Sequence, residues 1–130
     1  MREMKIVFGE NHRVEAHYKG LVIQTDQPVK VGGNGSAPAP FDLFLASIGT
    51  CAGYYVQQFC KQRNISTENI HLTQTMHVDP ATRMIGEIEI NIFLPPDFPE
   101  QYKQSVIKAA EACAVKKHIS NAPDFSVNIV

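Results

Sequence analysis

Residues 40–64, PFDLFLASIGTCAGYYVQQFCKQRN, decide the fold. Between Asp42 and Lys61 the stretch has no charged residue, and its apolar side chains fall on every side of a helical wheel. A surface helix normally has one apolar stripe and a charged opposite face. We therefore predict a helix over Pro40–Asn64 that is buried nearly all round, with Cys51 near its middle.

This helix is too long for one chain to cover. At ~1.5 Å per residue its length is roughly 36 Å. A compact chain of 130 residues has a radius of gyration of only about 14 Å. The mismatch predicts that a second copy of the chain covers part of the helix, in a homodimer.

The segment before the helix predicts a three-stranded antiparallel meander. Charged and apolar residues alternate in it, as in half-buried strands, over Met4–Phe8, Arg13–Tyr18 and Leu21–Thr25. A loop rich in Gly and Pro follows over Gln27–Ala39, and loops of this length are usually functional or flexible. Pro40 suits the first turn of a helix, where the charge of Asp42 is also favourable.

After the helix the pattern predicts a hairpin, a second helix and a last strand. Their expected ranges are Ile70–Val78, Met84–Leu94, Pro99–Val115 and Asp124–Val130. Cys113 lies on the inward face of the second helix, and Phe125, Val127 and Ile129 are expected to point inward from the last strand. The order is βββ-α-ββ-α-β. Because strands and helices are segregated, we predict an α+β fold in a single domain over residues 1–130.

Composition and charge argue against several classes of function. A net charge of −1 and a pI of about 6.5 give no basic field for nucleic acid or a membrane surface. The N-terminus has no signal-peptide core, and polar residues interrupt the central apolar run too often for a membrane span. Three cysteines without a secretory signal predict a cytoplasmic protein with reduced thiols.

Cysteine is the residue type whose placement suggests chemistry. Cys51 and Cys60 are nine residues apart, about 180° round one helix, so they cannot face the same pocket. Two helices side by side bring Cys51 and Cys113 within disulfide reach if their Cα atoms lie closer than about 7 Å. From spacing alone the alternative stays open that both are small buried hydrophobes. No CxxC or paired histidine spacing indicates a metal site.

Two segments carry a family resemblance. The run GGNGSAPAPFDLFLASIGTCAGYYV, followed by AAEACAV around Cys113, resembles the OsmC/Ohr superfamily, the osmotically inducible protein C and organic hydroperoxide resistance proteins. The predicted element order is similar to that family's fold. The resemblance implies an intertwined homodimer with two sites at the subunit interface. It also implies a thiol-dependent peroxidase that reduces organic hydroperoxides or hydrogen peroxide in oxidative-stress defence, without a cofactor or metal.

The resemblance also implies roles for individual residues. Cys51 matches the peroxidatic cysteine, which becomes a sulfenic acid, and Cys113 matches the resolving cysteine, which condenses with it to a disulfide. An external dithiol then resets the pair by exchange. Arg13 stands where peroxidases of the family carry an arginine that activates the thiolate. Their helix-opening proline is followed by a glutamate, whereas Phe41 follows Pro40 here and the nearest acid is Asp42.

Two functions from different classes follow. The pair Cys51 and Cys113 favours the peroxidase, whereas Phe41 favours a non-catalytic dimeric protein that binds a small ligand. Arg13 as a solvated strand residue, Asp42 as a helix-start charge and Cys60 as core packing are the ordinary alternatives. For a reactive Cys51, burial must be offset, because desolvation raises a thiol pKa above about 8.5. The amides in the middle of its own helix are already bonded, which leaves Arg13 as the expected source of stabilisation.

Overall fold

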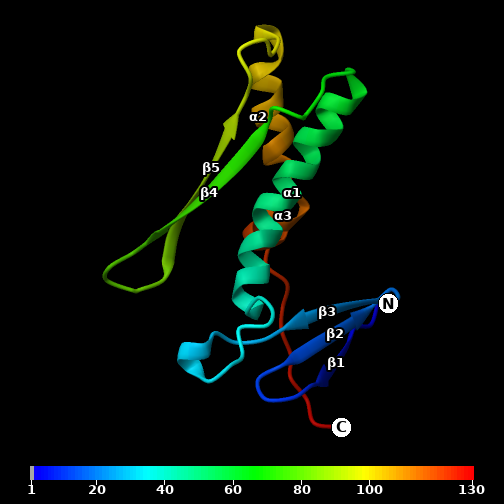
Figure 1. The fold of residues 1–130 in the computed structure, drawn as a ribbon, viewed down its shortest axis with the longest axis vertical. Helices are drawn as coiled ribbons and strands as arrows, with labels where there is room; N and C mark the ends of the chain where they lie inside the picture. Colours follow the sequence, from blue (N-terminus) through cyan, green and yellow to red (C-terminus); the bar gives the residue numbers. More distant parts are fainter. Residues whose placement is uncertain (1) are drawn as a thin grey trace. The chain divides into compact units, whose positions relative to one another are not determined.

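A computed structural model describes residues 2–130 and has a mixed α+β fold, as the sequence predicts (Figure 1). The chain divides within its long helix into two units, one ending at Ala46 and the other beginning at Ser47. The strands are β1 (Lys5–Phe8), β2 (Val14–Tyr18), β3 (Leu21–Thr25), β4 (His71–Val78) and β5 (Ile85–Phe93). The helices are α1 (Pro40–Gln62), α2 (Lys103–Glu111) and α3 (Ala114–Ser120), with 3₁₀ turns η1 (Val29–Val31) and η2 (Glu100–Tyr102).

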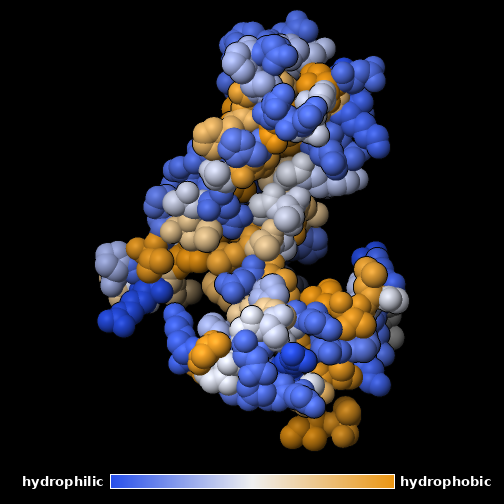
Figure 2. Space-filling view, in the orientation of Figure 1, coloured by the Kyte–Doolittle hydropathy of each residue, from blue (hydrophilic) through white to orange (hydrophobic). Residues whose placement is uncertain are grey.

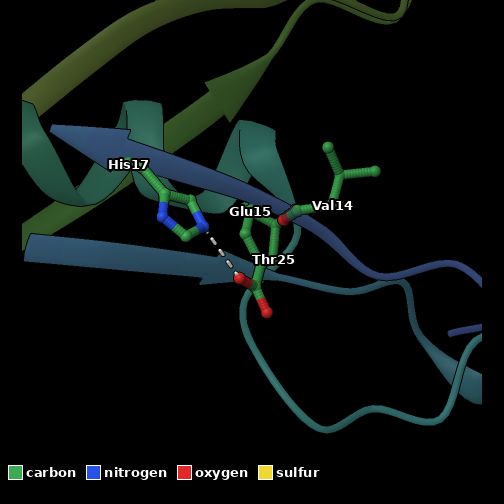
Figure 3. Close-up of polar contacts among 4 residues, drawn as sticks. All are labelled: Val14, Glu15, His17 and Thr25. Atoms are coloured by element: carbon green, nitrogen blue, oxygen red, sulfur yellow. Dashed lines mark hydrogen bonds and ion pairs between the residues drawn. The ribbon is translucent and has the colours of Figure 1, made fainter. Parts of the chain in front are cut away.

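The first unit contains the predicted meander, an antiparallel sheet in the order β1-β2-β3. Its register places Ile6, Ala16 and Ile23 opposite one another across the three strands. Figure 3 shows Glu15 and His17 of β2 side by side, with His17 Nε2 3.1 Å from Glu15 Oε2. Residues two apart in a strand share a face, so the apolar and the charged residues of β2 lie on opposite sides of the sheet.

The apolar face of this sheet is open in the single chain. Ile6 and Leu21 are 56% and 68% exposed, and Figure 2 shows apolar surface over the sheet. A small sheet needs its apolar face packed against other structure for stability. Further apolar surface is therefore required to cover it.

The second unit holds the main core. The second half of α1 supplies Val56, Phe59 and Cys60, and they cluster with Phe98 and Val106 of the segment after the hairpin. Leu72 of β4 and Ile92 of β5 pack against this cluster. The antiparallel hairpin β4–β5 confirms the predicted pair of strands to within one residue at each end.

Helix α1 begins at Pro40 as predicted and ends at Gln62. Asn64 follows with φ 56°, a left-handed conformation typical of a helix end. In the single chain only one stripe of α1 is buried, made of Ile48, Ala52, Val56, Phe59 and Cys60. Phe41 and Tyr54 are about half exposed, at 52% and 54%. The burial nearly all round that the sequence predicts is thus not present within one chain, which offers α1 only one packing face.

The predicted second helix is interrupted. Turn η2 leads into α2, which ends at Glu111, and α3 begins at Ala114. Between them Cys113 has an extended backbone, with φ −59° and ψ 125°, and its thiol accepts a hydrogen bond from the backbone N–H of Lys116. Cys113 therefore caps the N-terminus of α3 and does not lie inside a helix.

The predicted last strand over residues 124–130 is not formed. Phe125 and Val127, expected to point inward, are 89% and 97% exposed. A strand requires a neighbouring strand to accept its hydrogen bonds, and within one chain this segment pairs with none. Among residues 2–130 no helix is long and apolar enough to cross a membrane.

Candidate active site: a cysteine pair

The structure brings Cys51 and Cys113 together within the second unit. Cys51 is half-buried on α1, beside the buried Ala52, and Cys113 is buried immediately before α3. The Cys113 side chain lies close enough to Cys51 to lower its pKa, and both thiols are free rather than joined in a disulfide. Helix α1 and the residue before α3 therefore place the predicted pair side by side in its reduced form.

Hydrogen bonds to Cys51 favour its thiolate. Burial by itself raises the pKa of Cys51, but the backbone N–H of Val115, the thiol of Cys113 and the backbone N–H of Ala114 act against it, and the net pKa lies below its ordinary value. The N–H groups in the first turn of a helix have no carbonyl partner within that helix, so they are available to a thiolate. Cys51 is thus stabilised as an anion by backbone donors of a neighbouring helix.

Sequence reasoning missed these donors. The prediction of one unbroken helix over Pro99–Val115 left every amide near Cys113 already bonded. No Ser, Thr, Asp or Asn marks a new helix start there, and these are the preferred capping residues. The break at Cys113 thus had no local signal in the sequence.

The pKa of Cys113 is shifted in the opposite direction. Burial raises its pKa, the Lys116 N–H partly offsets this, and the neighbouring Cys51 raises it again. Its Sγ atom lies 3.4 Å from the Lys116 nitrogen and 4.0 Å from the carbonyl oxygen of Ile48. The pKa of Cys113 is therefore raised and that of Cys51 lowered, so Cys51 is the more readily ionised thiol of the pair.

Cys60 lies in the core of the second unit, as its position nine residues from Cys51 predicts. It is fully buried among Val56, Phe59, Phe98 and Val106. Burial raises its pKa, and the charge of Arg63 offsets this only in part. Cys60 therefore packs as a small hydrophobe and has no contact with solvent.

Arg13 belongs to the first unit, where it contacts the Gly-rich loop. Its Nε donates a hydrogen bond of 3.2 Å to Ser36 Oγ. Ser36 Oγ in turn donates to Asp26 Oδ2 over 2.6 Å. Asp42 lies in the first turn of α1, and among residues 2–130 no hydrogen bond or ion pair joins it to Arg13. Sequence reasoning missed both Asp26 and Ser36.

Comparisons with known proteins agree with this architecture. The sequence model of the family described as OsmC-like protein matches residues 33–128. A search of curated proteins gave no match. A structure from Psychrobacter arcticus, described as an osmotic stress induced and detoxification response protein, has a TM-score of 0.72 at 23% identity and covers 90% of this chain and 87% of its own.

Two further similar structures are described as organic hydroperoxide resistance proteins. The one from Elizabethkingia anophelis has a TM-score of 0.56 at 22% identity and covers 93% of this chain and 91% of its own. The one from Legionella pneumophila has a TM-score of 0.53 at 21% identity and covers 92% and 88%. At these identities the likeness establishes the fold alone. Because the family match spans most of the sequence, including both cysteines of the pair, the chain belongs to the OsmC-like protein family.

Proposed function

We propose that this protein is a thiol-dependent peroxidase that reduces organic hydroperoxides or hydrogen peroxide. The observation that carries the proposal is the Cys51–Cys113 pair, in which one thiol is held toward its anion and the other toward its neutral form. A thiolate is the reactive nucleophile, so a lowered pKa at one half-buried cysteine is what the chemistry needs. The similar structures named as organic hydroperoxide resistance proteins support the same activity.

In the first step the Cys51 thiolate attacks the distal oxygen of the peroxide. A sulfur–oxygen bond forms, the oxygen–oxygen bond breaks, and the leaving alkoxide takes a proton to become an alcohol. Cys51 is then a sulfenic acid, oxidised by two electrons, and the peroxide is reduced by two. The backbone donors at the start of α3 are already in place for the anion before the reaction.

In the second step Cys113 attacks the sulfenic sulfur and releases water. Contact between the two thiols shortens the lifetime of the sulfenic acid and so protects it from irreversible oxidation. An external dithiol, oxidised to its own disulfide, returns the Cys51–Cys113 disulfide to two thiols. We propose a cytoplasmic location, where such reductants keep thiols reduced.

We propose that the functional unit is a homodimer. We also propose that Arg13 is the arginine that assists Cys51. The exposed apolar residues of the first sheet and of α1, including Ile6, Leu21 and Tyr54, supply the surface that a second copy would cover. A guanidinium beside a peroxide can hydrogen-bond its oxygens and stabilise the leaving alkoxide. Asp42 is retained as a candidate acid near the start of α1.

Substitution of each cysteine tests the proposal. Cys51→Ser is expected to abolish peroxide consumption, and Cys113→Ser to remove turnover that depends on the disulfide. Cys60→Ser is the matched control, because Cys60 lies on the same helix but packs in the core, and it should leave consumption largely intact. Measurement of cumene hydroperoxide loss with excess dithiothreitol distinguishes the variants. Peroxide consumption that depends on a residue other than Cys51 would contradict the proposal, and no consumption in wild type would favour the alternative, a dimeric protein that binds a small ligand without turnover.

A further inference from the structure

We propose that Ser36 and Asp26 are positioning residues that hold the Arg13 guanidinium for the reaction at Cys51. This inference rests on the proposed peroxidase function and deepens it. It assigns to the Gly-rich loop the task that a carboxylate at the start of α1 performs in the peroxidase pattern. The loop and Arg13 lie in the same unit, so the contacts between them are established within that unit.

The anchor is Asp26, a fully buried carboxylate directly after β3. Its Oδ1 accepts the backbone N–H of Gln27 at 2.7 Å. Its Oδ2 accepts both the backbone N–H and the hydroxyl of Ser36, at 3.0 and 2.6 Å. Its own N–H donates to the carbonyl oxygen of Pro38 at 3.2 Å. A buried carboxylate with this many donors is firmly held, so it fixes the two ends of the loop to each other.

The shape of the loop depends on its glycines. A Cβ at Gly33 would lie 1.9 Å from the carbonyl oxygen of Gln27, so only glycine fits there. Gly35 has φ +63° and donates its N–H to that same oxygen. These two positions make the tight turn that delivers the next residue, Ser36, to Asp26. The contact between Ser36 and Asp26 therefore requires the glycines of the run GGNGS.

Ser36 in turn holds the side chain of Arg13. The serine proton is used toward Asp26, which leaves the lone pairs of Oγ to accept the Nε–H of Arg13 at 3.2 Å. Among residues 2–130 no other hydrogen bond holds the Arg13 side chain. Its two terminal amino groups are therefore available to another partner. A guanidinium bound through Nε presents those two groups as a planar fork of N–H donors.

The arrangement accounts for Phe41. An acid at that position is expected where the arginine must be oriented from α1. Here Arg13 is held instead through the neutral hydroxyl of Ser36, which is itself bonded to the carboxylate of Asp26. A hydrophobic residue after Pro40 is then compatible with peroxidase activity.

The test is a double-mutant cycle on kcat/KM for cumene hydroperoxide, measured on the full chain. Ser36→Ala removes one hydrogen bond to Arg13 and is expected to lower kcat/KM about fivefold, as for an interaction of ~1 kcal/mol. Arg13→Ala is expected to lower it about tenfold or more. In the Arg13→Ala background, Ser36→Ala should cause no further loss, because a positioning residue acts only through the group it positions. A full fivefold loss in that background would overturn the proposal.

Matched variants separate positioning from loop stability. Ser36→Thr keeps the hydroxyl and should restore most of the activity lost in Ser36→Ala. Asn34→Ala removes a contact of the same loop, the 3.2 Å bond from Asn11 Nδ2, but leaves the path from Asp26 to Arg13 intact, so it should leave kcat/KM near the wild-type value. Equal losses in Asn34→Ala and Ser36→Ala would contradict the assignment.

A second readout does not depend on activity. In nitrogen-15 NMR spectra the Arg13 Nε–H signal should move and exchange faster with solvent in Ser36→Ala, but not in Asn34→Ala. If that signal is unchanged in Ser36→Ala, the positioning contact is wrong whatever the kinetics. If the signal changes but wild type consumes no peroxide, the contact stands and it is the peroxidase function that fails.

Discussion

At the scale of single residues, Cys51 and Cys113 are the same chemical group in two different surroundings. Cys51 receives donors from Val115 and Ala114, whereas Cys113 is more fully buried and adjoins the developing charge of its partner. Two identical thiols in contact cannot both ionise easily, because the second charge is repelled by the first. The donors at the start of α3 favour ionisation of Cys51, the thiol that we propose as the nucleophile.

Asp26 gives a pH-dependent prediction at the same scale. Hydrogen bonds from the Ser36 hydroxyl, the Ser36 N–H and the Gln27 N–H hold its pKa well below the usual range in the folded protein. A carboxyl with a depressed folded pKa contributes stability above its unfolded pKa of about 3.9, and this is lost as the pH falls through that value toward the folded pKa.

Asp26→Asn should therefore be less stable than wild type at neutral pH, and the two should converge as the pH falls below about 4. Thermal unfolding midpoints measured across this range check the prediction. Glu15→Gln is a matched control, since Glu15 also lies in the first unit but outside the loop. Parallel curves for wild type and Asp26→Asn would contradict it.

At the scale of elements, the break between α2 and α3 creates the site. An unbroken helix through Cys113 would use the N–H groups of Ala114 and Val115 for its own hydrogen bonds. Because the backbone of Cys113 is extended, these groups are instead free to reach Cys51. The break in a helix that the sequence predicts as regular thus frees the backbone donors that lower the Cys51 pKa.

Ala114→Pro tests this element directly. Proline is tolerated in the first position of a helix, and an extended preceding residue, here Cys113, accommodates it. The substitution removes one N–H donor from Cys51, so the Cys51 pKa should rise while α3 remains folded. The pH dependence of Cys51 alkylation measures the change, and Ala114→Gly, which keeps the N–H, serves as the control. An identical midpoint in Ala114→Pro and Ala114→Gly would show that the amide has no part in activating Cys51.

The sequence predicts the regular elements well and the irregular ones poorly. The meander, α1 and the hairpin follow from apolar periodicity, which depends on local residues alone, and their bounds agree to within two residues. The extended backbone of Cys113 depends on tertiary contacts, with the carbonyl of Ile48 close to its thiol. The burial of Asp26 depends on the closure of a loop of left-handed glycines. Periodicity carries no information on either.

At the scale of the whole molecule, a single chain leaves much apolar surface uncovered. The apolar face of the first sheet, Phe41 and Tyr54 of α1 and the alternating residues Phe125, Val127 and Ile129 are all exposed. Exposed apolar surface on this scale marks an interaction site. The same residues explain why the predicted last strand is missing, since within one chain it lacks a strand beside it.

We predict that the protein is a dimer at micromolar concentration. Obligate dimers bury upwards of about 2,000 Å² of largely apolar surface. Sedimentation velocity should show two chains per particle, and a charged substitution on the open face of the first sheet, Ile23→Lys, should shift the protein toward monomer. Val22→Lys, on the opposite face of the same strand, is the control. A stable, folded wild-type monomer at that concentration would contradict the prediction.

The proposal that Cys51 reduces a peroxide and that Cys113 then forms a disulfide with it can be tested on the protein's own thiols. The reduced protein is treated with one equivalent of cumene hydroperoxide, and its free thiols and intact mass are then determined. We predict that each chain loses two thiols, that its mass falls by two hydrogens, and that a peptide pair linked through Cys51 and Cys113 appears, with Cys60 still free. Unchanged thiols, or oxygen added to Cys51 without a disulfide to Cys113, would contradict it.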